Sequence, residues 1–282
     1  MTKDKMRNFK VAIFGTAASY HDLAAKKYYG QDVDIVECGT FRQCCDMLKG
    51  NHADYAVMAI ENSLAGSILT NYNLIDEYKF RIIGEQYLRI ELNLLALDGV
   101  KIEEIEYVHS HPMALAQCTA FLAQYPHIKV VEQGDTASCV KNIATKNLRN
   151  TAAIANKYAS EIYQVPVLHA SIENNKQNFT RFMILSKGDA CPDQPNKASV
   201  CFRLRHEVGC LVEILNVFKQ NQISLSKIQS VPVMRHPNEY SFHTDVEWTK
   251  YENYQNAITA IKGEANTFSV LGEYIKASIS QS

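Results

Sequence analysis

Short apolar segments alternate with helix-like segments over the first two thirds of the chain, and this alternation constrains the fold most. Several helix-like segments open with a capping residue such as Ser19, Thr40 or Asp135. Strands that alternate with helices predict a doubly wound α/β region. The predicted strands are residues 9–14, 55–60, 92–97, 107–109, 130–131, 151–155 and 181–185, and the predicted helices are residues 19–29, 40–50, 113–124, 136–147 and 156–163.

A polar segment with two prolines, residues 188–197, separates this region from the rest of the chain. The rhythm then changes to strand, helix, two strands, helix and strand, which is a ferredoxin-like βαββαβ arrangement. A chain of 282 residues is also longer than a single hydrophobic core usually supports, so we expect two domains. The predicted strands are residues 198–204, 225–234, 240–248 and 268–271, and the predicted helices are residues 208–220 and 251–262.

Composition excludes several classes of function. A formal net charge of −1 gives no electrostatic reason to expect nucleic-acid binding. No apolar run approaches the roughly 20 residues that span a bilayer, and residues 1–10 lack a secretory apolar core. The eight cysteines show no zinc-ligand spacing, so we expect free thiols, no metal and a cytoplasmic location.

Polar turns follow several predicted strands and lead directly into helix N-termini, at residues 15–20, 63–67, 110–112 and 135–138. Unpaired backbone N–H groups and the helix dipole make such ends favourable for anions. If these ends converge, the expected ligand is a small carboxylate. For any single turn, however, the simpler interpretation is that its Ser or Thr only caps a helix.

Three of these polar segments carry a resemblance to a known family. Glu61-Asn62-Ser63 with Gly66-Ser67 resembles the E-N-S-x-x-G-S turn of prephenate dehydratases. Residues 110–118 are similar to their S-H-P-Q-A-L-A-Q-C segment, and residues 174–182 contain their T-R-F signature. The three motifs occur in the family's order and spacing, and the likeness covers nearly the whole chain. The sequence is therefore similar to a prephenate dehydratase.

The resemblance implies a fold and a domain plan. Residues 205–212 and 270–274 are similar to two segments of the C-terminal ACT domain that these enzymes carry. The implied catalytic domain covers residues 1–188 and folds like a periplasmic binding protein, with one lobe at about 1–82 and 166–188 and the other at about 83–165. The implied ACT domain covers residues 197–282.

The resemblance also implies catalytic residues for a reaction that removes carbon dioxide and water from prephenate and needs no cofactor. Thr180 is assigned to help the ring hydroxyl leave, because positioned proton donation typically contributes about 10²–10⁴ in rate. Asn62, Ser110 and Gln117 are expected to orient the substrate, with Ser110 and Gln117 on one helix face. Glu61 is expected either to act on a proton or to anchor a helix end.

Four further residues are assigned to substrate binding: Ser19, Ser67, Arg181 and Phe182. Arg181 is suited either to a substrate carboxylate or to a structural ion pair, and Phe182 is more typical of packing. The expected effector is L-phenylalanine, held where the helix after Gly209 begins. The implied effector residues are Gly209, Cys210, Leu211, Val212, Gln229 and Ser230.

The sequence departs from the family pattern at three places. Residues 15–20 lack the proline and the middle glycine of the usual G-P-x-G-S-[FY] turn, and Met113 replaces a glutamine. Gln229 and Val231 replace the charged residues of a regulatory E-S-R-P segment, which predicts a weakened phenylalanine response.

The expected partners are prephenate, the effector and a further copy of the chain in a homodimer or homotetramer, with no nucleic acid and no membrane. Two alternative functions stay open at this point. One is an arogenate dehydratase, whose substrate carries an amine in place of the keto group. The other is a catalytically degenerate, carboxylate-binding regulatory protein of the same fold.

Overall fold

The computed structural model describes residues 9–188, 191–205, 207–233 and 239–279. The chain divides into two compact units, the first of residues 1–66, 86–182 and 279–282 and the second of residues 67–85 and 183–278. Strands β5 (Arg81–Arg89) and β11 (Phe179–Ser186) contribute residues to both units. The domain and lobe boundaries expected from the sequence stay predictions.

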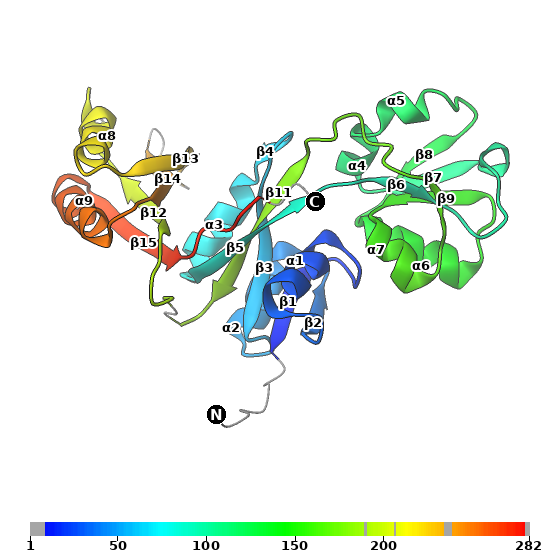
Figure 1. Cartoon of the computed structure of the whole chain (residues 1–282), viewed down its shortest axis with the longest axis horizontal. Helices are drawn as coiled ribbons and strands as arrows, with labels where there is room; N and C mark the ends of the chain where they lie inside the picture. The colour runs from blue at the N-terminus through cyan, green and yellow to red at the C-terminus, as the bar shows by residue number, and fades with distance from the viewer. Residues whose placement is uncertain (1–8, 189–190, 206, 234–238, 280–282) are drawn as a thin grey trace. The chain divides into compact units, whose positions relative to one another are not determined.

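The first sheet is built on parallel strands at the N-terminus (Figure 1). Its strand order is β2 (Asp34–Cys38), β1 (Lys10–Phe14), β3 (Tyr55–Asn62), β11 and β5, with β4 (Gly66–Ser67) paired to β3. Helices α1 (Tyr20–Tyr29) and α2 (Phe41–Lys49) pack against β1 and β3. The strands predicted at residues 9–14 and 55–60 are confirmed, whereas β2 and β4 were not predicted.

The second sheet has the strand order β10 (Val167–His169), β6 (Asn93–Leu95), β9 (Thr151–Ala155), β7 (Tyr107–Ser110) and β8 (Lys129–Glu132). It is mixed, because β7 runs parallel to β8 and β9 while β6 runs antiparallel to β9. Side chains alternate along β9, so Ala152 and Ile154 enter one core while Ala153 and Ala155 enter the other. Helices α4 (Pro112–Ala116) and α5 (Thr119–Leu122) contribute to the first core, and α6 (Thr136–Lys146) and α7 (Lys157–Tyr163) to the second (Figure 1).

The helix predicted at residues 113–124 is wrong, because two short helices replace it: α4 (Pro112–Ala116) and α5 (Thr119–Leu122). Asn174 interrupts the helical hydrogen bonds in two ways. Its backbone N–H donates to the Gln117 carbonyl at 2.7 Å, and its side-chain oxygen accepts from the Ala120 N–H at 3.1 Å. Gln117 therefore ends a helix, although the sequence pattern predicts it inside one. Helices α6 (Thr136–Lys146) and α7 (Lys157–Tyr163) agree with prediction.

The C-terminal part of the second unit confirms the βαββαβ prediction. Its strand order is β13 (Ser224–Pro232), β14 (Tyr240–Glu247), β12 (Lys197–Arg203) and β15 (Thr267–Tyr274). Helices α8 (Cys210–Gln220) and α9 (Tyr251–Glu264) pack on one face of this sheet (Figure 1). Residue 234, the predicted end of one strand, lies outside the described residues, as do linker residues 189 and 190 and residue 206 of the predicted effector turn.

The second unit also contains α3 (Leu69–Tyr78) and the first half of β5, which meet the βαββαβ sheet closely. A side chain at Gly272 on β15 would overlap the carbonyl oxygen of Ile82 on β5. Lys197 at the start of β12 lies 3.1 Å from the carboxylate of Glu85, and both side chains are buried. The glycine and the paired charges therefore let β5 and this sheet pack without a gap.

Candidate active site

The end of β3 fixes the side chain of Asn62. Its oxygen, Oδ1, accepts hydrogen bonds from the backbone N–H groups of Leu64 at 3.0 Å and Ala65 at 2.9 Å. This is a turn closed by an asparagine side chain, a role for which asparagine is well suited. Because a backbone N–H can only donate, the atom facing Leu64 and Ala65 must be the amide oxygen. The amide nitrogen of Asn62 therefore faces the neighbouring strand β11.

Asn62 Nδ2 meets the start of β11 through two side chains. It donates to Thr180 Oγ1 at 3.0 Å and to Asn178 Oδ1 at 2.7 Å, with the Phe179 carbonyl at 3.3 Å. Thr180 Oγ1 is thus a hydrogen-bond acceptor from Asn62. The hydrogen of the Thr180 hydroxyl has no acceptor within the described part of the chain, so it is available to a bound molecule.

Asn178 connects this pair to Gln117. Its amide nitrogen donates to Gln117 Oε1 at 2.9 Å, and its side chain is fully buried. Gln117 caps the end of α4 and is half-buried. The structure therefore brings together Asn62, Thr180 and Gln117, three residues expected at the site. No role was assigned to Asn178 from the sequence, although it is the second asparagine of the family's N-x-x-N-x-T-R-F stretch, which this segment resembles.

Ser110 does not join this group. It ends strand β7, and its buried hydroxyl donates to the Ile154 carbonyl at 2.6 Å. The expectation that Ser110 and Gln117 share a helix face is wrong, because Ser110 belongs to a strand. His111, which is not among the predicted site residues, accepts from the Met113 N–H at 3.2 Å and caps α4.

Glu61 precedes Asn62 on β3 and is half-buried. Successive side chains of a strand point to opposite faces, so Glu61 faces away from the side chain of Asn62. Arg181 has the same relationship to Thr180 on β11, and its buried guanidinium lies over the ring of Tyr87 at 5.9 Å. The roles assigned to Glu61 and Arg181 in substrate binding or catalysis stay predictions.

Phe182 packs beneath the site against a buried histidine. Its ring meets that of His21 edge-on, with centroids 5.0 Å apart. His21 Nε2 accepts from the Ala59 N–H on β3 at 3.3 Å, and burial lowers the pKa of His21 to about 3. A neutral histidine therefore supports β3, and sequence reasoning missed it because no motif contains it. Phe182 has the packing environment that we considered more typical of it.

Two backbone N–H groups of the turn at residues 15–20 donate to side chains of the protein itself. The N–H of Ala17 donates to the Glu37 carboxylate at 2.6 Å, and the N–H of Ala18 donates to the Asp22 carboxylate at 2.7 Å. Ser19 caps α1 by accepting from the Asp22 N–H at 3.3 Å and is buried. For this turn the capping interpretation therefore has direct support. Ser67 lies half-buried on β4, and its contact with substrate stays a prediction.

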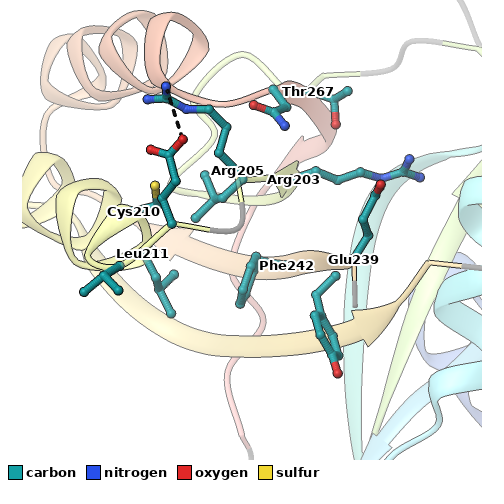
Figure 2. Close-up of a pocket in the computed structure, with 12 residues that line it drawn as sticks. Arg203, Arg205, Cys210, Leu211, Glu239, Phe242 and Thr267 are labelled. Atoms are coloured by element: carbon teal, nitrogen blue, oxygen red, sulfur yellow. Dashed lines mark ion pairs between the residues drawn. The ribbon is translucent and has the colours of Figure 1, made fainter. Parts of the chain in front are cut away.

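A pocket of about 670 Å³ lies in the second unit, where the βαββαβ sheet meets the start of α8 (Figure 2). Two of the residues that line it, Arg205 and Glu207, form an ion pair with N and O atoms 3.8 Å apart. Its lining residues are Arg203, Leu204, Arg205, Glu207, Val208, Cys210, Leu211, Glu239, Tyr240, Phe242, Asn266 and Thr267.

Two of the predicted effector residues, Cys210 and Leu211, line this pocket. Gly209 has a φ of 93° and comes directly before α8, a backbone conformation that glycine adopts without strain. Val212 is exposed, and Gln229 and Ser230 lie on β13 outside the set of lining residues that the structure describes. The six assignments as an effector site stay a prediction.

The fold is that of an α/β protein with a C-terminal βαββαβ part, and the amide–hydroxyl group of Asn62, Asn178, Gln117 and Thr180 is its candidate site. A family model described as prephenate dehydratase matches residues 11–190. The chain therefore belongs to the prephenate dehydratase family.

Relatives agree over most of the chain. A bifunctional chorismate mutase/prephenate dehydratase of Enterobacter agglomerans is 34% identical over 271 residues, which cover 94% of this chain and 70% of the relative. An arogenate dehydratase/prephenate dehydratase of Arabidopsis thaliana is 35% identical over 277 residues, which cover 94% of this chain and 72% of the relative.

Solved structures share the fold. A prephenate dehydratase from Arthrobacter aurescens in complex with L-Phe has a TM-score of 0.85 at 25% identity, covering 95% of this chain and 90% of that one. A structure described as a quorum-quenching acylase has the same score and identity, covering 95% and 98%. The fold predicted from the sequence, a periplasmic-binding-protein-like region followed by a βαββαβ domain, is confirmed. Because one fold can host several chemistries, the activity has to be argued from the site.

Proposed function

We propose that the chain converts prephenate into phenylpyruvate, carbon dioxide and water. Family membership supports the reaction class, and the hydrogen bond from Asn62 to Thr180 carries the mechanism. This bond occupies the oxygen of Thr180 and leaves its hydrogen available for the ring hydroxyl of prephenate. A matched donor aimed at a leaving group is what this reaction requires.

The proposed reaction breaks two bonds of prephenate in one step. The bond between the ring and its carboxylate breaks and carbon dioxide leaves, and the released electron pair completes the aromatic ring. The bond between the ring and its hydroxyl breaks with its electron pair leaving on the oxygen, and this oxygen takes a proton that solvent supplies and leaves as water. Thr180 donates a hydrogen bond to that oxygen in the transition state, a contribution of about 10²–10⁴ in rate. Because aromatisation drives the reaction without a redox change, we propose no cofactor.

The remaining assignments concern positioning. Asn62 holds Thr180, and the side-chain nitrogen of Gln117 is available to donate to an oxygen of the substrate. The family resemblance assigns a substrate carboxylate to Arg181, whose guanidinium offers two parallel N–H donors to such a group, although its buried side chain faces away from that of Thr180. The family resemblance alone assigns Glu61, Ser110, Ser19, Ser67 and Phe182 to the site; the hydroxyls of Ser110 and Ser19 already bond within the protein, and Phe182 packs on His21.

The C-terminal βαββαβ domain is proposed to be an ACT domain that senses L-phenylalanine. The A. aurescens structure contains L-Phe, and the pocket beside α8 in this chain carries both acidic and basic side chains, as an amino acid requires. The edge strand β13 leaves backbone groups that a second copy could cover, which supports a homodimer or homotetramer. The eight free cysteines support a cytoplasmic location. Among the described helices, none is both long and apolar enough to cross a membrane.

The test is an assay of the purified protein with prephenate and with arogenate, each against a no-enzyme control because prephenate aromatises spontaneously in acid. We expect phenylpyruvate from prephenate at neutral pH. Turnover of arogenate alone would make the chain an arogenate dehydratase, a name that relatives carry. Binding of either compound without turnover would favour the regulatory alternative.

A further inference from the structure

We infer that Asn178 is a positioning residue of the proposed dehydratase site, which it serves by fixing the atom that Gln117 presents to the substrate. This inference rests on the proposed function. Asn178 lies between Asn62 and Gln117 and is hydrogen-bonded to both. Its effect on the reaction passes through Gln117 and through the Asn62–Thr180 pair.

The orientation of these amides begins at the backbone. The N–H groups of Leu64 and Ala65 can only donate, so they fix the oxygen of Asn62 toward themselves. The nitrogen of Asn62 then faces Asn178, whose nearest atom must be an acceptor, its oxygen Oδ1. The two backbone donors therefore fix the orientation of the Asn178 side-chain amide, with its oxygen toward Asn62.

The orientation of the Asn178 amide in turn fixes the orientation of the Gln117 amide. Because the oxygen of Asn178 is used by Asn62, its nitrogen faces Gln117 and requires the oxygen Oε1 there. Gln117 Nε2 has no acceptor within the described part of the chain. The side chain of Gln117 therefore presents N–H donors, and donors match the carboxylate and hydroxyl oxygens of prephenate.

Burial holds Asn178 in this role. Its side chain is fully buried, so water cannot readily replace either hydrogen bond. Its backbone carbonyl accepts from the Ile90 N–H at 2.7 Å, which fixes the main chain at the start of β11. With both the backbone and the side chain held, Asn178 cannot turn without breaking bonds to Asn62 and Gln117.

The decisive variant is Asn178→Asp. A carboxylate can only accept, so Gln117 would turn to donate its nitrogen to Asp and present its oxygen to the substrate. We expect kcat/KM to fall by about 10²-fold at neutral pH, as for loss of a positioned donor. Burial raises the pKa of a carboxylic acid, and the protonated acid can again donate to Gln117. Relative to the unmodified protein, activity should therefore recover as the pH falls from about 7.5 to 5.

Two companion variants separate positioning from packing. Asn178→Ala carries no titratable group, so its loss should not vary with pH relative to the unmodified protein. Asn175→Asp makes the same substitution in the same loop at an exposed residue, where an acid can still accept from the Gln177 N–H, now 2.8 Å away. We expect Asn175→Asp to keep full activity. Every rate is corrected for spontaneous aromatisation at the same pH.

Undiminished activity of Asn178→Asp at neutral pH would overturn the inference, as would equal, pH-independent losses in folded Asn178→Asp and Asn178→Ala. If Asn178→Asp does not fold, a double-mutant cycle of Asn178→Ala with Gln117→Ala decides. We expect the loss from Asn178→Ala to shrink when Gln117 is already alanine, and additive losses would overturn the inference. Inactivity of the unmodified protein would instead refute the proposed function.

Discussion

The side-chain nitrogen of Asn62 donates a hydrogen bond to the hydroxyl oxygen of Thr180 at 3.0 Å. The direction of this bond is fixed, because the oxygen of Asn62 is held by the backbone N–H groups of Leu64 and Ala65. Thr180 is consequently oriented as a donor toward whatever occupies the site. The relationship joins the end of β3 to the start of β11, two strands that are neighbours in the sheet but distant in sequence.

Asn62→Asp tests that direction. One carboxylate oxygen can still accept from Leu64 and Ala65, but the other would face the oxygen of Thr180 and attract its hydrogen. We expect kcat to fall by about 10²-fold or more while substrate binding changes little, because the donor is lost mainly in the transition state. Steady-state kinetics check this, with Asn142→Asp on the exposed face of α6 as the control. A rise in KM with kcat unchanged would contradict the assigned direction.

Local sequence patterns predicted some elements of this fold and missed others. The buried strands were predictable because runs such as residues 55–60 are apolar and short, and the capping residues Ser19, Thr40 and Asp135 all begin helices as expected. The break between α4 and α5 was not predictable, because it depends on Asn174, a residue more than fifty positions away. Local periodicity does not register such a contact.

For the candidate site, too, motifs found residues but did not show their contacts. Motifs pointed to Asn62, Gln117 and Thr180, which the structure joins, but also to Ser110, whose hydroxyl is used by a neighbouring strand. Asn178 belongs to the family-like stretch before Thr180, but the sequence does not show that it is buried or that it bonds to both Asn62 and Gln117. Ala18 adopts a φ of 67° where the family motif has glycine, and only the surrounding core explains how alanine is held there.

Gly272→Ala tests the close packing of β15 against β5. A methyl group at Gly272 would overlap the carbonyl oxygen of Ile82, so one strand must move. We expect a loss of about 1–3 kcal/mol in the free energy of unfolding, typical of overpacking. A methyl group at Gly263 on α9 would meet no described atom within 4 Å, so Gly263→Ala should be neutral or stabilising. Equal effects of the two variants in urea unfolding would refute the predicted contact.

His243 makes stability depend on pH. Burial lowers the pKa of this histidine to about 4, against the opposing influence of Asp76 and Asp245. The unfolded chain therefore binds a proton below about pH 6.5 that the folded chain refuses until about pH 4, so stability falls as the pH falls through this window. Because of His243, we expect the free energy of unfolding to fall by about 2 kcal/mol as the pH is lowered from 6.5 to 4.5.

The measurement is urea unfolding at both pH values for the unmodified protein and for His243→Gln, which cannot titrate. The variant should show a shallower decline in the free energy of unfolding as the pH is lowered. Parallel declines in the two proteins would show that other groups cause the acid sensitivity.

The phenylalanine response is expected to be weak. Val231 is buried and Gln229 donates to the neighbouring Ser230 carbonyl, so neither supplies the charge found in the family's E-S-R-P segment. We expect L-phenylalanine to bind between about 10 µM and 1 mM and to inhibit less than in relatives that keep those charges. Calorimetry and an inhibition curve check this, with D-phenylalanine as the control. Inhibition at low micromolar concentration would show that the charges are dispensable, and no binding at millimolar concentration would show that the sensing role is lost.

We propose that the Thr180 hydroxyl assists the loss of the ring hydroxyl, and kcat for phenylpyruvate formation from prephenate by Thr180→Ala and Thr180→Ser measures this role. We predict a fall of about 10²-fold or more for alanine with KM nearly unchanged, and much smaller losses for serine, which keeps a hydroxyl. A Thr180→Ala variant that retains kcat, or a folded Thr180→Ser variant as inactive as Thr180→Ala, would rule out this role for Thr180.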